Sequence, residues 1–455
     1  MKCKEEIILE TQKPVSIGDR IEMLVDGHLI ADAENAQLRM YRPRRGETAL
    51  AMERPWEGPG SGVYSTVFRD GGKFRMYYRA TSPDNEGGDR GASQFCCCAE
   101  SADGMHWERP DLGLFAFRGS KANNIVMAGV EAHNFSPWLD ENPACPAGEK
   151  FKAVCGLSPH GLMAYKSADG YTWEKLQEEP VITEGEFDSH NLWFWDVNTR
   201  CYRCYSRYWE GRWSGIRAVQ SCTSADFRHW STHTHNQYGD VPLEHFYTNA
   251  TALCPGAPHH YLSFPMRFVG NRKKWEDYPD TGVSDSIFMS SRDGVHFDRG
   301  FTEPWIAPDL DPRNWTQRNY ITACGILETS PAEFSLYVNE HYQWDDAFIR
   351  RYTVRRHGFG SIYGDWRGGR FTTRPLIFDG DALYLNYATS SVGLVRVGIL
   401  GPEGFGVAEC DEIYGNELDK KVSWGGNSNL SQLRGRPVRL VIELKDADLF
   451  AIRFG

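Results

Sequence analysis

Short runs in which apolar and polar residues alternate, separated by turns rich in glycine, proline and aspartate, fill most of the chain. VYSTVFRD (63–70) and KFRMYYRA (73–80) are two such runs. This pattern is typical of β-strands, because successive side chains of a strand point to opposite faces of a sheet. No segment keeps the 3.6-residue period of an amphipathic helix. The chain is therefore predicted to be all-β.

One motif recurs four times and gives this pattern a period. Its copies read SADGMHW, SADGYTW, SADFRHW and SRDGVHF, and their aspartates are Asp103, Asp169, Asp226 and Asp293. The intervals of 66, 57 and 67 residues indicate repetition of one supersecondary unit. Aspartate accepts backbone N–H groups in a tight turn, and glycine there takes a positive φ. The motif is thus predicted to be a structural hairpin turn.

Strand-like runs on both sides of each motif give four antiparallel strands per unit, as in a propeller blade. A fifth unit follows, with its turn degenerated to Arg356-His357-Gly358-Phe359. We therefore expect a five-bladed β-propeller over residues 58–360. Alternating runs over residues 361–455 predict a β-sandwich. Residues 1–57 are predicted to form an N-terminal β arm that packs on the propeller.

Composition narrows the range of partners. The 455 residues include 50 Lys and Arg against 61 Asp and Glu, a net charge of −11. Nucleic acid and anionic membrane surfaces are therefore not expected as partners. The opening MKCKEEIILETQKP is charged where a secretory segment would be apolar, which predicts a cytoplasmic protein. Oligomeric state stays open.

The blade topology also predicts where the chemistry lies. First strands begin at one end of the central channel, the turn motifs lie at the other, and second strands end near the beginnings of the first. Strand starts place at this functional face Ser61, Tyr64, His133, Asn134, Asp188, His190, Asn191, Glu244, Tyr247, Asn249, Arg318 and Asn319. Strand ends and the following loops add Arg79, Arg207, Arg267, Glu340, His341, Asp89, Arg90 and Asp285. So many charged residues predict a site.

Carboxylates, arginines and aromatic rings together suit glycoside chemistry. One carboxylic acid protonates the leaving oxygen, a second carboxylate acts as base or nucleophile, and aromatic faces stack on sugar rings. The arginines have two possible roles. They neutralise the carboxylates, or they hold an anionic or hydroxyl-rich substrate through forked hydrogen bonds.

Nine phrases, spread over nearly the whole chain, carry a resemblance to a known group: LVDGHLI, RPWEG, FDSHNLWFWD, YTNA, FMSSRDGVHFDRG, LDPRNW, VNEHY, RRYTVRRHGF and LKDADL. They resemble bacterial family-32-like glycosyl hydrolases, which are similar to the invertase, levansucrase and arabinanase type. The resemblance implies cleavage of a glycosidic bond in a small glycoside or oligosaccharide. It makes Asp188 the base or nucleophile and Glu340 the acid, with Glu244 as a competing acid. Asp188 and Glu340 each also have a possible structural role instead. Asp188 would cap backbone N–H groups of its loop, and Glu340 would form an ion pair with Arg318 or Arg350.

The remaining face residues are expected to bind substrate: Arg79, His133, Asn134, His190, Asn191, Arg207, Asn249, Arg267, Asp285, Arg318, Asn319 and His341. No cofactor is required, no histidine pair has a zinc-like spacing, and a structural Ca²⁺ in the channel is compatible with the sequence. Two alternatives stay open. One is a sialidase-like hydrolase, because the turn motif resembles the sialidase Asp-box. The other is a non-catalytic propeller that binds carbohydrate or protein.

Overall fold

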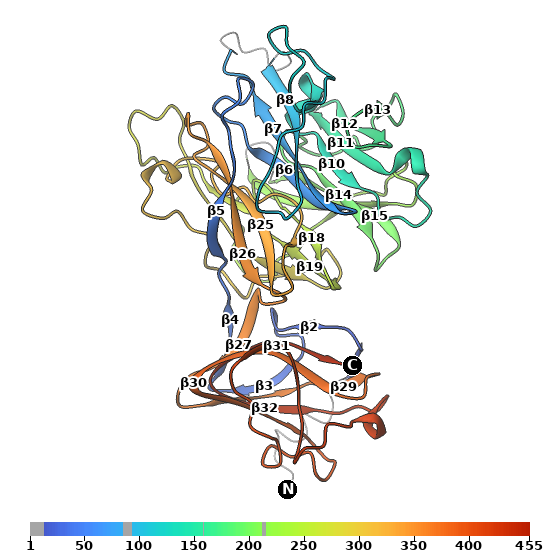
Figure 1. Ribbon diagram of the computed structural model, residues 1–455, viewed down its shortest axis with the longest axis vertical. Coiled ribbons are helices and arrows are strands. Elements are labelled where there is room, and N and C mark those ends of the chain that lie inside the picture. The colour runs from blue at the N-terminus through green and yellow to red at the C-terminus, as the bar shows by residue number, and fades with distance from the viewer. Residues whose placement is uncertain (1–12, 85–92, 158, 212–214) are drawn as a thin grey trace. The chain divides into compact units, whose positions relative to one another are not determined.

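The computed structural model describes residues 13–84, 93–157, 159–211 and 215–455, and nearly all of its regular structure is β (Figure 1). The chain divides into two compact units. One is Pro43–Thr353, and the other combines Met1–Arg42 with Val354–Gly455. Asp89 and Arg90, predicted at the functional face, lie outside the described residues.

Five four-stranded antiparallel sheets form the unit Pro43–Thr353, which confirms the predicted five-bladed β-propeller. Blade one contains β6 (Val63–Asp70), β7 (Lys73–Thr81), β8 (Gln94–Ser101) and β9 (Ile125–Ala128). Blade two contains β10 (Ser136–Leu139), β11 (Phe151–Leu157), β12 (Gly161–Ser167) and β13 (Glu174–Lys175). Blade three contains β14 (Leu192–Asp196), β15 (Cys201–Glu210), β16 (Ile216–Ser224) and β17 (Thr234–His235).

Blade four contains β18 (Ala252–Cys254), β19 (Ala257–Ser263), β22 (Met289–Ser291) and β23 (Phe297–Asp298). A separate hairpin, β20 (Met266–Val269) with β21 (Val283–Ser286), extends it between β19 and β22. Pro265 lies between β19 and β20 and has no backbone N–H to continue the ladder, which accounts for the break. Three short 3₁₀ turns also belong to this unit: η1 (Val130–His133), η2 (Ala147–Glu149) and η3 (Pro312–Asn314).

The fifth blade closes the ring with a strand from the other end of the sequence. Its strands are β24 (Leu327–Glu328), β25 (Glu333–Glu340), β26 (Phe348–Arg355) and, outermost, β5 (Arg44–Ala51) (Figure 1). We expected the fourth strand directly after Arg356–Phe359, and this was wrong. The segment there, β27 (Gly360–Gly364), pairs instead with β4 (Ala36–Met40). Pairing of β5 with β26 joins the two ends of the propeller sequence by hydrogen bonds, which locks the ring.

The four turn motifs form the predicted hairpin turns. In the first, Asp103 Oδ1 accepts the N–H groups of Met105 and His106 at 2.7 and 2.9 Å, and Ser101 Oγ accepts that of Gly104 at 2.8 Å. The other three copies repeat these bonds. Hydrogen bonds from the backbone and ring of His106 hold the pKa of Asp103 well below its usual range. These aspartates therefore serve the turn.

The turns also connect neighbouring blades through tyrosines of the second strands. Tyr77 Oη donates to Gly170 O and Tyr205 Oη to Gly294 O, each at 2.8 Å. Tyr337 on β25 donates likewise to the carbonyl of Gly104 in blade one, across the ring closure. The third copy differs, because Phe227 replaces the glycine at φ 65° and packs in one core cluster with Val154, the residue at the tyrosine position of blade two.

Replacing Asp103 with alanine is expected to lower the free energy of unfolding by about 1–3 kcal/mol, because two turn N–H groups lose a charged acceptor. Turnover per folded molecule should stay the same. Urea unfolding measures the first quantity and steady-state kinetics the second. Asp103→Asn is the matched control, since it keeps the acceptor oxygen and should lose less. Loss of turnover in Asp103→Ala at unchanged stability would contradict a structural role.

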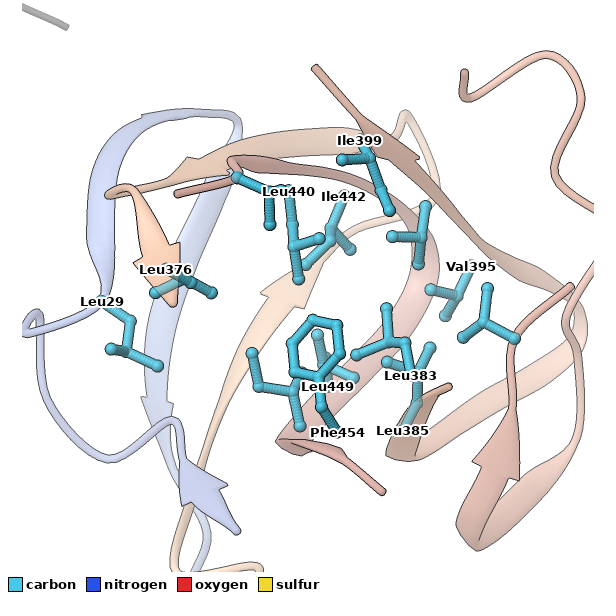
Figure 2. Packing of buried hydrophobic residues seen from close by; sticks show 14 of the residues in the cluster. Leu29, Leu376, Leu383, Leu385, Val395, Ile399, Leu440, Ile442, Leu449 and Phe454 are labelled. Atoms are coloured by element: carbon cyan, nitrogen blue, oxygen red, sulfur yellow. The ribbon is translucent and has the colours of Figure 1, made fainter. Parts of the chain in front are cut away.

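The second unit has one apolar core, shown in Figure 2. An eight-stranded sheet comprises β2 (Glu22–Met23), β3 (Ile30–Glu34), β4, β27, β28 (Gly369–Thr373), β30 (Leu383–Ile399), β31 (Asn416–Lys421) and β32 (Leu440–Phe454). A parallel pair joins β1 (Val15–Gly18) to β29 (Leu376–Phe378), and η4 (Ser431–Leu433) is a 3₁₀ turn. Leu383, Leu385, Ile442 and Leu449 point from β30 and β32 into the core (Figure 2).

The N-terminal segment does not form the single arm that we expected over residues 1–57. Its described strands β1 to β4 pair with C-terminal strands, whereas β5 completes the fifth blade. The reason is in the pattern of β3 and β4, whose partly buried Ile30, Ala36 and Leu38 pack against the C-terminal core. Among the described residues, no helix is long and apolar enough to cross a membrane.

Candidate functional site

A pocket of about 290 Å³ opens where the first strands of the propeller begin. Its lining is Pro59, Gly60, Tyr64, Arg79, Thr81, Gln94, His133, Asp188, Tyr247, Arg318, Tyr342 and Gln343. The predicted face thus contributes Tyr64, Arg79, His133, Asp188, Tyr247 and Arg318. No sequence signal pointed to Thr81, at the end of β7, or to Gln94, at the beginning of β8. Tyr342 and Gln343 follow the predicted His341 directly.

Asp188 supplies the carboxylate of this pocket. It precedes β14, and its Oδ1 pairs with Nη2 of Arg207 on β15 of the same blade. The Asp188 side chain is 47% exposed, whereas that of Arg207 is 5% exposed. The Arg207 guanidinium also lies 5.4 Å from the ring centre of Tyr247. A fixed, buried cation therefore orients a carboxylate that substrate can reach.

Tyr64 lies at the floor of the pocket in a constrained conformation. Its φ is 53°, a region that side chains other than glycine rarely adopt. Its ring stacks on His190 at 5.6 Å and meets the His133 ring edge-on at 5.9 Å. Burial raises the pKa of the Tyr64 hydroxyl, so this group remains protonated at neutral pH. We propose that packed rings fix Tyr64 and His133 before substrate arrives.

His190 is buried and neutral. Neither of its ring nitrogens has a hydrogen-bond partner among the described residues, and burial lowers its pKa to about 3. The unfolded chain binds a proton at this histidine below pH about 6.5, whereas the folded protein does so only near pH 3. Stability contributed by the neutral ring is therefore lost as pH falls from 6.5 towards 3.

Between pH 7 and pH 4, the wild type is expected to lose about 3 kcal/mol more unfolding free energy than His190→Phe, at about 1.4 kcal/mol per pH unit below 6.5. Phenylalanine keeps the ring that stacks on Tyr64 and does not titrate. Urea unfolding of both proteins at several pH values checks this. Parallel pH profiles would contradict the assignment of a buried neutral His190.

Glu340 does not line the pocket. Its fully buried carboxylate accepts hydrogen bonds from Arg45 Nη2 at 2.5 Å, Arg350 Nε at 2.7 Å, Tyr352 Oη at 2.9 Å and Asn314 Nδ2 at 3.0 Å. The ion pair with Arg350 is the structural alternative that the sequence left open. With both oxygens occupied, Glu340 is placed to hold β5, β25 and β26 together, which speaks against a general acid.

Glu244 and Asp285 belong to another cluster, around Arg267 on the β20–β21 hairpin. Arg267 donates to Asp285 Oδ1 and Oδ2 at 2.9 and 2.6 Å and to Glu244 Oε1 at 2.9 Å. Arg299 donates to the second Glu244 oxygen at 2.7 Å. Burial raises the pKa of Asp285, and Arg267 opposes this rise. Arg267 therefore neutralises two carboxylates, and none of these residues is part of the pocket lining.

Four predicted substrate ligands instead bind backbone. The buried side-chain amides of Asn134, Asn191, Asn249 and Asn319 form hydrogen bonds with main-chain groups. Asn319 Oδ1, for example, accepts the N–H of Tyr342 at 2.8 Å and so positions a pocket residue. His341 lies between Asp311 and Asp346, at 2.8 and 3.0 Å. These contacts point to supporting rather than binding roles.

Another cavity, of about 360 Å³, lies where the first strands end. Most of its lining is apolar and includes Phe68, Trp138, Phe194 and Trp195. Such a surface offers few groups that recognise hydroxyls, so the pocket around Asp188 is the better candidate for polar chemistry.

Comparisons with known proteins give relatives without an established activity and distant structural neighbours. No family model matches the chain. It is 29% identical over 126 residues to the uncharacterized protein Rv1502 of Mycobacterium tuberculosis (strain H37Rv) and to the uncharacterized protein MT1551 of strain CDC 1551, spanning 27% of this chain and 37% of either relative. The chain thus spans little more than a third of these relatives.

Similar solved structures include a glycoside hydrolase (TM-score 0.47, 12% identity, 69% of this chain and 92% of that one). Another is the α-L-arabinofuranosidase Arb93A from Fusarium graminearum, with a TM-score of 0.43 and 11% identity over 70% of this chain and 98% of that one. A third is an N-acetylgalactosamine deacetylase from F. plautii, with a TM-score of 0.43 and 12% identity over 74% of this chain and 96% of that one. All three scores lie below 0.5, so the function of this chain has to be argued from its own residues.

Proposed function

We propose that this protein is a glycoside hydrolase that cleaves a small glycoside or oligosaccharide in the pocket around Asp188. One observation carries the proposal: an accessible carboxylate, held by a buried arginine, faces a pocket walled by Tyr64, Tyr247 and Tyr342. Its volume is near the lower end of the roughly 300–1,000 Å³ of ligand pockets, which suits one sugar unit.

Asp188 is the reacting group in this proposal. Glycosidic cleavage passes through an oxocarbenium-like transition state, and a carboxylate on one face of the sugar acts as base toward water or as nucleophile. Arg207 holds Asp188 in place, and the tyrosine rings offer surfaces for the sugar. Asp188 is the one carboxylate in the described pocket lining. Leaving groups of low basicity, such as nitrophenolates, need no acid and should react best.

A panel of nitrophenyl glycosides, followed by natural oligosaccharides with detection of released sugar, tests this proposal. We expect turnover of at least one nitrophenyl glycoside by the wild type and its loss in Asp188→Asn. Turnover that persists undiminished in Asp188→Asn would move the reaction elsewhere. No release from any member of the panel would contradict hydrolysis.

A second candidate is a propeller that binds carbohydrate without cleaving it. The specific observation in its favour is the single carboxylate in the described lining, because most glycosidases use two. This candidate would be favoured over hydrolysis if a sugar bound saturably without being cleaved and if Asp188→Asn left that binding unchanged.

A further inference from the structure

We infer that the pocket binds an anionic group of its substrate, a carboxylate or sulfate on a sugar, through Arg79 and Arg318 of its lining, while Arg217 beside the lining residue Tyr247 adds positive charge. This inference rests on the proposed function, since it names the class of sugar for the same pocket. Its basis is that Arg79 and Arg217 have no carboxylate partner among the described residues, and that the only one Arg318 has there, Asp280, is 3.8 Å away.

Arg79 is the most informative of the three. It lies two residues before the end of β7 and is 6% exposed, yet it forms no ion pair with a carboxylate among the described residues. Its Nη2 donates to Gly60 O and Tyr342 Oη, each at 3.1 Å, and its Nε is buried without a hydrogen-bond partner in the described part of the chain. A buried cation is usually paired, because removal from water is costly. Arg79 thus offers an uncompensated charge to the pocket that it lines.

Arg318 and Arg217 add to this charge. Arg318 lies over the Tyr342 ring at 4.6 Å, and its nearest carboxylate, Asp280, is 3.8 Å away. Arg217, on β16, has no carboxylate partner in the described chain and lies 5.1 Å from the centre of the Tyr247 ring. Burial, together with the charges of Arg207 and Arg318, lowers the pKa of Arg217. An anion between these groups would relieve their repulsion.

Other buried arginines of the propeller show the contrast. Arg75 pairs with Asp70 at 2.8 Å, Arg203 with Asp196 at 3.0 Å and Arg299 with Glu244 at 2.7 Å. Among the described residues, four arginines in or next to the pocket lining (Arg79, Arg207, Arg217 and Arg318) are accompanied by the two carboxylates Asp188 and Asp280. This leaves an excess of two positive charges there, in a protein of net charge −11. Neutralisation of neighbouring carboxylates therefore explains Arg207 and Arg267, whereas binding of an anion explains Arg79, Arg217 and Arg318.

Isothermal titration at low salt with four probes tests this inference: glucuronate, glucose 6-sulfate, glucose and inorganic sulfate. We expect the wild type to bind glucuronate or glucose 6-sulfate at least tenfold more tightly than glucose, because charge-assisted hydrogen bonds contribute roughly 1.5–3 kcal/mol. The tighter of these two sugars distinguishes carboxylate from sulfate. Inorganic sulfate alone should bind more weakly than either, since it lacks the ring that contacts the tyrosines.

Arginine variants test where the anionic sugar binds. Arg318→Gln, on a partly exposed side chain, should reduce the preference for the anionic sugar about tenfold and leave glucose binding unchanged. Arg79→Met should do the same if it folds. Arg69→Met is the matched control, because Arg69 lies on β6 at the end opposite Tyr64 and lines the other cavity. Equal binding of glucose and both anionic sugars, or equal effects of Arg318→Gln and Arg69→Met, would overturn the inference.

Failure of the inference and failure of the proposed function give different results. Hydrolysis of neutral nitrophenyl glycosides without any preference for anionic sugars would retain the hydrolase and overturn the anion site. Tight binding of anionic sugars without hydrolysis of nitrophenyl glucuronides or neutral glycosides would retain the site and contradict the hydrolase.

Discussion

Replacing Asp188 with asparagine is expected to lower kcat on a nitrophenyl glycoside by about 10²–10⁴, because removal of a positioned base or nucleophile typically costs this much. Asparagine has nearly the same shape and keeps an oxygen next to Arg207, so KM and the melting temperature should change little. Steady-state kinetics beside thermal unfolding measure both effects. A kcat within twofold of the wild type would remove Asp188 from the reaction.

Arg207→Lys is the accompanying variant. Lysine keeps the positive charge and loses the guanidinium Nη2 that contacts Oδ1 of Asp188. We expect a smaller loss of kcat than in Asp188→Asn, and no additional loss when both changes are combined, since both act through the same carboxylate. Additive losses in the double variant would mean that Arg207 acts on the substrate independently of Asp188.

Replacing Glu340 with glutamine is expected to destabilise the propeller by about 3–5 kcal/mol, because it removes the charge of a fully buried carboxylate that pairs with both Arg45 and Arg350. Turnover per folded molecule should remain. Urea unfolding with activity measured on the folded fraction separates the two quantities. The variant also weakens the connection between β5 and the rest of the fifth blade.

Glu333→Gln is the matched control for this prediction. Glu333 begins the strand β25 that Glu340 ends, and its ion pair with Arg44 is solvent-exposed. Its loss should cost at most about 1 kcal/mol. A similar small effect for Glu340→Gln, together with a large loss of turnover, would restore Glu340 as a catalytic acid and contradict the structural role.

The propeller could be predicted because its turn motif combines local signals that tertiary context does not override. Ser101 and Asp103 cap their own turn, so the sequence alone defines the hairpin and its period. Closure by β5 could not be predicted in this way. This strand precedes the first repeat and carries no turn motif, and its partner β26 lies about 300 residues away.

Blade topology predicted which residues lie at one end of the channel, and Tyr64, Asp188 and Arg318 of that set line one pocket. Position along a strand does not reveal what a side chain binds. Glu340 ends a second strand and Arg79 lies near the end of another, yet the Glu340 carboxylate binds Arg45, 295 residues away in sequence. The asparagines before the first strands were likewise predicted as ligands, although their buried amides bind backbone. Partners distant in sequence decide between these roles.

The central claim, that the pocket around Asp188 is where the sugar reacts, is tested most directly by a crystal structure of Asp188→Asn soaked with the glycoside that the wild type hydrolyses best. The account predicts intact glycoside in the pocket, its ring against Tyr64, Tyr247 or Tyr342 and its anomeric carbon beside position 188. Glycoside bound instead in the apolar cavity at the other end of the channel, or on the second unit, would contradict it.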